Sequence, residues 1–336
     1  MIEPGKTNGL NDVDGLRTGH YSNEKSACGV TVVLCEDGAV AGVDVRGAAP
    51  GTRETDLLSP QNLVQQIHTL VLSGGSVFGL AAADGVVRWL SEKGIGFPLD
   101  DVHVAPIVPA AVLYDLGRGE VFIPAIDSGW GRSACENASG GKISMGCVGA
   151  GTGALSGNIK GGLGTASAIL DTGITVAALV AVNSLGSVVN PATGRFWEVE
   201  LGIGNEFGHR SGRQVVLPPP PFGEPAKNTS IGVVATDAVL TKVQAQKIAQ
   251  MAHDGLGRAI RPCHTMFDGD ALFCMSTGKK NLSDTKGFFD MVHAAAINEI
   301  GHAAADCVSR AVIHAILNAD SRYGMTAFCD LEQQKH

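Results

Sequence analysis

The chain has 336 residues, of which 44% are hydrophobic and 17% charged, whereas an average globular protein has about 25% charged residues. This balance excludes an intrinsically disordered chain, and the length suffices for one large domain or two ordinary ones. The formal net charge of −8 argues against a nucleic-acid partner, whose binding needs clustered Lys and Arg.

The first half of the chain alternates short apolar segments with turn signals. Residues 28–46 predict two short strands joined by a hairpin turn at residues 36–38. Residues 76–92 have the apolar spacing of a helix that ends at Gly94, and Ser76 is its predicted N-cap. The other elements expected here are a short helix over 60–68, strands over 69–72, 104–113 and 174–182, and a glycine-dense loop over 140–164.

The composition changes at residues 217–225, which contain five prolines. Proline lacks a backbone donor and fixes φ, so this segment predicts an exposed linker rather than a helix or a central strand. Beyond it, the pattern predicts strands over 228–236 and 271–276 and helices over 241–253 and 288–318. Strands and helices mix without a repeat, which indicates an α/β or α+β protein with layered sheets covered by helices.

The cysteines and the N-terminal segment indicate the compartment. Eight cysteines are dispersed without a C-x-x-C pair or a zinc-type spacing, so we expect reduced thiols. The first residues lack the apolar core of a signal peptide, and no stretch approaches the ~18 apolar residues of a membrane span. These features predict a cytoplasmic protein without a membrane partner.

Two motifs that suggest cofactors are set aside. Residues 149–154 fit the G-x-G-x-x-A pattern of dinucleotide-binding proteins, but the chain that follows is too glycine-rich for the required helix. Asp268-Gly-Asp270 suggests a metal loop, yet no further carboxylate or His follows at ligand spacing. The sequence therefore predicts neither an organic cofactor nor a metal.

The junction between Asn228 and Thr229 has two interpretations. One is simply the start of a strand after a linker. The other is self-cleavage, in which the Thr229 hydroxyl attacks the carbonyl of Asn228, the peptide becomes an ester, and water releases two chains. The new α-amine of Thr229, with a pKa near ~7.7–8.0, would then accept the hydroxyl proton and make Thr229 a nucleophile.

The residues around this junction resemble the self-cleavage segment of the P1 peptidases, also called the DmpA-type aminopeptidases or peptidase family S58. The resemblance covers nearly the whole chain, since six blocks occur in the expected order: residues 9–15, 43–56, 72–80, 148–153, 160–167 and 228–237. The Asn–Thr junction is similar to that of the nylon-oligomer hydrolases and of a pantetheine-cleaving enzyme in this family.

The resemblance implies roles for individual residues. Asn183 matches an asparagine of the oxyanion hole, a donor typically worth about 3–4 kcal/mol of barrier. Asp268 and Asp270 match an acidic pair that orients the nucleophile in the nylon-oligomer branch, and residues two apart share a face of a strand. Lys160 matches a lysine near the nucleophile, where its charge would keep the threonine amine neutral. Tyr114 matches a tyrosine of the substrate pocket.

The resemblance also implies the architecture: a four-layer αββα sandwich of the DmpA and ornithine-acetyltransferase type, similar to N-terminal-nucleophile hydrolases. Residues 1–336 would form one domain, self-cleaved into an α chain of residues 1–228 and a β chain of residues 229–336. The two chains would stay associated and assemble into a homo-oligomer, a tetramer of αβ units.

The expected reaction is hydrolysis of a small peptide or amide through an acyl-enzyme on Thr229. Aminopeptidase activity is the default of the family. Hydrolysis of 6-aminohexanoate (nylon) oligomers is the alternative that Asp268 favours, because the aminopeptidases tend to have Ser there; a pantetheine-type amidase is a third. An acyltransferase and an unprocessed binding protein are weaker alternatives.

Overall fold

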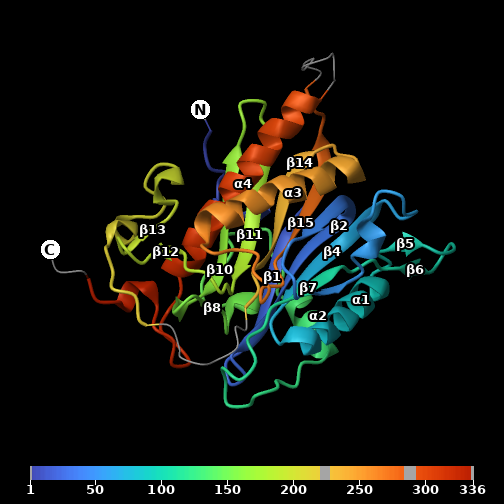
Figure 1. The fold of residues 1–336 in the computed structure, drawn as a ribbon. Helices are drawn as coiled ribbons and strands as arrows, with labels where there is room; N and C mark the ends of the chain where they lie inside the picture. The colour runs from blue at the N-terminus through green and yellow to red at the C-terminus, as the bar shows by residue number, and fades with distance from the viewer. Residues whose placement is uncertain (1, 220–227, 284–292, 334–336) are drawn as a thin grey trace.

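The computed structural model describes residues 2–219, 228–283 and 293–333 (Figure 1). Within these residues, nine strands pair in the order β10-β11-β14-β15-β2-β4-β7-β3, and β1 pairs with β2. Their bounds are β1 Arg17–Asn23, β2 Cys28–Val45, β3 Gly51–Arg53, β4 Gln66–Ser73, β7 Ala110–Val112, β10 Gly162–Ile169, β11 Thr175–Val182, β14 Ile231–Ala238 and β15 Ala271–Lys280.

The helices are α1 Ala82–Glu92, α2 Ser128–Glu136, α3 Lys242–Ala259 and α4 Ala294–Leu317. Three short hairpins lie outside the main sheet: β5 Phe97–Pro98 with β6 Val104–Ala105, β8 Leu155–Ser156 with β9 Ile159–Lys160, and β12 Val189–Asn190 with β13 Arg195–Phe196. Short 3₁₀ helices occur at η1 Leu10–Asp12, η2 Asp56–Leu58, η3 Ser76–Ala81, η4 Gly149–Gly151, η5 Val199–Leu201, η6 His209–Gly212 and η8 Phe328–Asp330.

The long strand β2 belongs to two half-sheets. Its first part pairs with β1 and β4, whereas its last part pairs with β15. Between the pairs Leu34↔Thr69 and Ala39↔Ile67 the register shifts, and Gly38 there has a φ of +87°. The predicted hairpin at residues 36–38 is therefore wrong. The turn residues form an irregularity within one strand, because β4 continues to pair with β2 on both sides of it.

Three apolar cores separate four layers, which confirms the αββα sandwich. One core lies between the two half-sheets and joins β2 and β4 to β10, β11, β14 and β15. A second core packs α3 and α4 on the outer face of the β10-β11-β14-β15 half, and a third packs α1 and α2 on the outer face of the other half. Figure 1 shows the two helix pairs over different parts of the sheet.

Local predictions held where periodicity was strong. The helix over residues 76–92 is present, although its first six residues are the 3₁₀ turn η3 and its N-cap is Gly75 rather than Ser76. Ser76 itself has a φ of +53°, a left-handed conformation uncommon for a residue with a side chain. The helix predicted over 60–68 is wrong, since β4 already begins at Gln66 and pairs with β2.

Helix α4 is the longest described helix. By length and composition it could cross a membrane, but 89% of its apolar window is buried inside the protein. Its first turns expose Asn298, Glu299 and His302, whereas its second half is almost entirely buried, as is typical of a core helix in a large domain. The predicted linker at residues 217–225 and the predicted helix start at residue 288 lie largely outside the described residues.

Candidate active site

The junction residues lie at the start of β14, between β11 and β15 in the sheet. Thr229 is 4% exposed. Its backbone N–H donates to the carbonyl of Asn183 at 2.5 Å, and the N–H of Gly269 donates to its hydroxyl oxygen Oγ1 at 3.0 Å. The Thr229 hydroxyl in turn donates to the carbonyl oxygen of Asn228. The hydroxyl therefore lies beside the peptide bond that it would attack.

A cavity of about 400 Å³ opens over this junction. Asn228, Thr229 and Tyr114 line it, which places the predicted pocket tyrosine beside the predicted nucleophile. The rest of the lining consists mainly of apolar and small residues: Ala49, Pro50, Gly51, Ser76, Val77, Val112, Leu113, Met266 and Phe267. Within the described part of the chain, no charged side chain lines the cavity.

Asn183 follows the last residue of β11 and is fully buried. Its side-chain amide nitrogen donates to the carbonyl of Tyr114 at 3.0 Å. Its side-chain oxygen accepts from the N–H of Leu155 at 3.0 Å and from the guanidinium of Arg118 at 2.5 Å. These contacts fix the amide in one orientation, next to the backbone that holds Thr229.

Arg118 was missed by the sequence reasoning. Its guanidinium joins Asn183 to the carbonyl of Gly153 in the glycine-rich loop. The available signal was a cation between two glycines, four residues after Tyr114. Beside it, burial raises the pKa of the Asp115 carboxyl to about 6, and the charge of Arg118 opposes that rise.

Lys160 is fully buried, but its contacts differ from the predicted one. Its ammonium donates to the carbonyls of Gly151, Ala154 and Gly161 at 2.9–3.2 Å, and none of its described contacts is with Thr229. Burial lowers its pKa to about 8. Lys160 thus binds the glycine-rich loop at Ala154, and the N–H of the following residue, Leu155, donates to Asn183. The link between Lys160 and the junction is therefore indirect, through this loop.

Asp268 and Asp270 flank Gly269, the residue whose N–H contacts the Thr229 hydroxyl. They precede β15 rather than lying on it, so the prediction that both carboxylates share one strand face is wrong. Asp270 accepts from the N–H of Ser230 at 2.7 Å. Asp268 instead accepts from Thr265 and from the N–H of Leu185. The two carboxylates therefore bind different parts of the site.

His264 is a second residue that sequence reasoning missed. Its ring nitrogen Nδ1 lies 2.8 Å from the second oxygen of Asp270, and its backbone N–H donates to that oxygen at 3.2 Å. Its neighbour Cys263 lies 3.6 Å from the same oxygen. The signal available in the sequence was their position, six and seven residues before Asp270.

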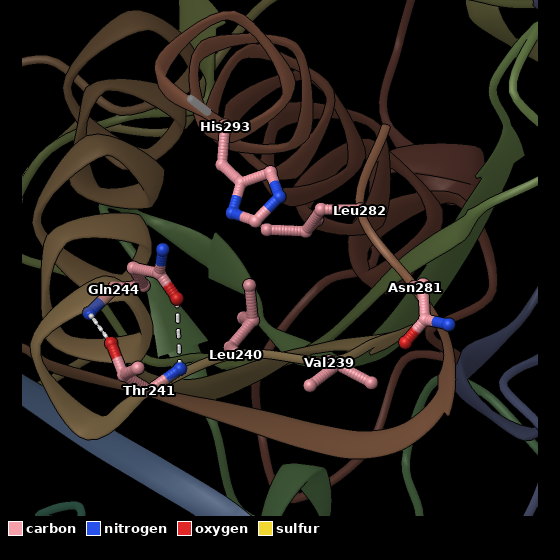
Figure 2. A pocket seen from close by; sticks show the side chains of 7 residues that line it. All are labelled: Val239, Leu240, Thr241, Gln244, Asn281, Leu282 and His293. Atoms are coloured by element: carbon pink, nitrogen blue, oxygen red, sulfur yellow. Dashed lines mark hydrogen bonds between the residues drawn. The ribbon is translucent and has the colours of Figure 1, made fainter. Parts of the chain in front are cut away.

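A second cavity, of about 390 Å³, lies at the other end of β14 (Figure 2). Val239, Leu240 and Thr241 line it, and the eight residues of β14 that separate it from Thr229 span about 26 Å. Thr241 there is the N-cap of α3, and its hydroxyl accepts from the N–H of Gln244. This cavity contains none of the candidate catalytic residues.

Comparisons with known proteins show which family and which relatives the chain resembles. The model of peptidase family S58 matches residues 8–328. A protein named as an uncharacterized aminopeptidase in Mycobacterium tuberculosis is 45% identical over 343 residues, covering 96% of this chain and 98% of the relative. A 6-aminohexanoate-oligomer endohydrolase of a Kocuria species is 30% identical over 291 residues, covering 82% of this chain and 77% of the relative.

Two solved structures share the fold. A Burkholderia β-aminopeptidase superposes with a TM-score of 0.73 at 24% identity, covering 97% of this chain and 92% of that one. The L-aminopeptidase D-Ala-esterase/amidase of Ochrobactrum anthropi, described as a variant of the Ntn hydrolase fold, gives 0.70 at 22% identity, covering 96% and 90%.

Proposed function

Because the chain belongs to peptidase family S58, we propose that it is an amide-bond hydrolase that cleaves itself before Thr229 and then uses Thr229 as its nucleophile. The observation that carries the proposal is the position of the Thr229 hydroxyl. It is buried beneath a cavity, contacts the carbonyl of Asn228, and receives the N–H of Gly269.

Self-cleavage requires the hydroxyl of Thr229 to reach the carbonyl carbon of Asn228 and requires the departing amine to be held in place. The contact between this hydroxyl and the Asn228 carbonyl supports the first requirement. The carbonyl of Asn183, 2.5 Å from the Thr229 nitrogen, supports the second, because it can accept from the new amine. Cleavage is the activating step, since a peptide nitrogen is not a base whereas a free α-amine is.

In the hydrolysis step, the Thr229 amine takes the hydroxyl proton as Oγ1 attacks the substrate carbonyl and later returns it to the leaving amine. Asn183 supplies a side-chain N–H to the developing oxyanion. The guanidinium of Arg118 donates to the side-chain oxygen of Asn183 and so orients the side-chain nitrogen of Asn183 toward the oxyanion. Asp270 holds the backbone next to Thr229. Water then releases the acyl group as a carboxylic acid.

The Lys160 ammonium acts indirectly in this scheme. It is hydrogen-bonded to three carbonyls of the glycine-rich loop, and that loop positions Asn183. Lys160 is therefore assigned as a positioning residue, whereas Tyr114 lines the substrate cavity.

The two fragments would remain associated after cleavage. Strand β14, from the C-terminal fragment, pairs with β11 from the N-terminal fragment, and β15 pairs with β2. Two of the three apolar cores contain residues from both fragments. Separation would expose those cores to water, so the fragments should behave as one folded domain.

The enzyme is proposed to act in the cytoplasm as a homo-oligomer. A reducing cytoplasm is supported by the eight cysteines, all of which are free thiols. Assembly into a tetramer of αβ units rests on the family alone.

The substrate we favour is a small peptide or peptide-like amide, cleaved by an aminopeptidase-type activity as the name of the mycobacterial relative suggests. The cavity lining supports a second candidate, an internal amide of a linear oligomer such as 6-aminohexanoate. Its described lining has apolar surface and no charge to bind a substrate ammonium, which suits a methylene chain.

Replacement of Thr229 tests the function. Thr229→Ala should leave the chain intact and inactive on amino-acid amides and on 6-aminohexanoate oligomers, while Thr229→Ser, which retains a hydroxyl, should keep both cleavage and activity. Thr277→Ala is the matched control. It removes a buried hydroxyl elsewhere in the protein, on β15, and should behave as wild type. Hydrolysis by a Thr229→Ala variant at the wild-type rate would refute the proposal.

A further inference from the structure

We propose that Cys263, His264 and Asp270 form a zinc site, and that zinc bound there inhibits the enzyme reversibly. Binding is a property of these three side chains alone, whereas the inhibitory effect rests on the proposed function. In the described part of the chain, the Cys263 sulfur, a ring nitrogen of His264 and a carboxylate oxygen of Asp270 all lie within 4.8 Å of one another.

The spacing of the three ligand atoms is close to the spacing around a tetrahedral zinc ion. Bond lengths of about 2.3 Å to sulfur and about 2.0–2.1 Å to nitrogen or oxygen place tetrahedral ligands about 3.3–3.6 Å apart. In the structure, Cys263 Sγ lies 3.6 Å from Asp270 Oδ2 and at nearly equal distances from the two ring nitrogens of His264, 3.4 Å from Nδ1 and 3.6 Å from Nε2, so the sulfur lies over the face of the ring. A zinc ion binds in the plane of an imidazole, so the partly exposed His264 ring must turn before Nδ1 and the sulfur can bind the same ion. The third edge, from Nδ1 to Oδ2, is 2.8 Å because a hydrogen bond now joins these atoms, and it would lengthen by about half an ångström on binding.

The surroundings allow an ion to enter. Cys263 and His264 are partly exposed, whereas Asp270 is 2% exposed and fixed by the N–H of Ser230 at its other oxygen. His264 has a φ of +57°, and its ring nitrogen Nδ1 lies against the Asp270 carboxylate. Three protein ligands leave a fourth position for water, as in open zinc sites.

The donor set selects the metal. A thiolate, an imidazole and a carboxylate favour zinc over Ca²⁺ or Mg²⁺, which prefer oxygen ligands. Without metal, burial and the carboxylate of Asp270 raise the pKa of the Cys263 thiol well above its ordinary value. The thiol is therefore protonated in the free protein, and zinc binding releases its proton.

The site lies next to the nucleophile. One carboxylate oxygen of Asp270 accepts from the backbone N–H of Ser230, the residue after Thr229. A zinc ion at the other oxygen of Asp270 would therefore be a dication near the Thr229 amine. That amine must become positively charged when it accepts the hydroxyl proton, and a nearby cation disfavours its charged form. Zinc should therefore slow acyl transfer without displacing substrate.

The binding test uses the whole protein after treatment with a chelator. Cobalt(II) should give the near-ultraviolet absorption of a cobalt–thiolate bond, and titration calorimetry should give one zinc per αβ unit. Cys263→Ser should remove the absorption and weaken zinc binding at least tenfold, and His264→Gln should weaken it similarly. Cys329→Ser, which replaces another partly exposed cysteine, is the control and should bind as wild type. Unchanged binding in Cys263→Ser would overturn the site.

The inhibition test compares hydrolysis with and without zinc for each variant, relative to its own metal-free rate. Zinc should lower kcat in wild type and Cys329→Ser but not in Cys263→Ser. Full activity of zinc-loaded wild type would overturn the inhibitory role. The Thr229→Ala variant separates this proposal from the catalytic one, because it should bind cobalt normally whether or not Thr229 is the nucleophile; loss of the thiolate absorption there would count against a site made by these three residues.

Discussion

Gly269 offers a sharp test of how closely the nucleophile is held. A Cβ at this position would lie 2.5 Å from the carbonyl oxygen of Ala49, 2.9 Å from the Thr229 hydroxyl oxygen and 3.0 Å from Cα of Pro50. The first and third neighbours are backbone. The Ala49 N–H also donates to the carbonyl of Asp268 at 2.9 Å, which ties the two segments together. Gly269→Ala must therefore move either this loop pair or the Thr229 hydroxyl.

The size of the effect follows from these contacts. Ordinary carbon contacts are about 3.5–4.0 Å, so the closest pair must separate by about 1 Å. Overpacking of this kind costs about 1–3 kcal/mol of stability, and a displacement of about 1 Å at a reacting atom can lower a rate about 100-fold. We expect Gly269→Ala to fold with reduced stability and to slow both self-cleavage and amide hydrolysis by about that factor.

The assay follows newly made protein in a cell-free translation system, with samples run on denaturing gels and unfolding measured in urea. Gly257→Ala is the matched control, because its Cβ meets nothing within 4 Å on the exposed side of α3. It should cleave normally and gain up to about 1 kcal/mol of stability. Wild-type rates in Gly269→Ala would refute the reasoning that the Thr229 hydroxyl is confined by this loop.

Three further predictions concern other parts of the molecule. Glu206→Gln should lower the free energy of unfolding by about 3–5 kcal/mol, because the buried Arg310 loses its carboxylate partner; an unchanged urea midpoint would contradict this. Burial raises the pKa of Asp115 to about 6, so the folded state favours the protonated carboxyl more than the unfolded state does. The stability that this difference contributes is fully present below pH ~4 and is lost as the pH rises through about 6. Relative to Asp115→Asn, wild type should thus lose about 3 kcal/mol over that range, and parallel pH curves would count against it. Asn183→Ala should lower kcat by about 10²–10³-fold if Asn183 holds the oxyanion; a loss below tenfold would exclude that role.

Much of the fold could be predicted because its signals are local. Strand β14 has an unbroken apolar run after a proline-rich segment, and α3 begins at a Thr241 capping box. The predicted hairpin within β2 was wrong because Gly38 gives the same signal in a turn and in an irregular strand. Only pairing with β4, which is remote in sequence, distinguishes the two.

Only part of the arrangement of the candidate site could be predicted from the sequence. Thr229 and Tyr114 do share a cavity, and Thr229 contacts Asn183. Lys160 binds loop carbonyls instead, a contact that depends on where the glycine-rich loop folds back. Arg118 has no spacing that links it to Asn183, so its role becomes visible only when the loop is placed in space.

The most direct measurement of the central proposal is the covalent state of the junction in purified, active protein. Intact-mass analysis with N-terminal sequencing should find fragments of 228 and 108 residues, the smaller beginning at Thr229, with hydrolysis appearing as they form. A fully active preparation that consists of one unbroken 34.6 kDa chain would contradict the proposal.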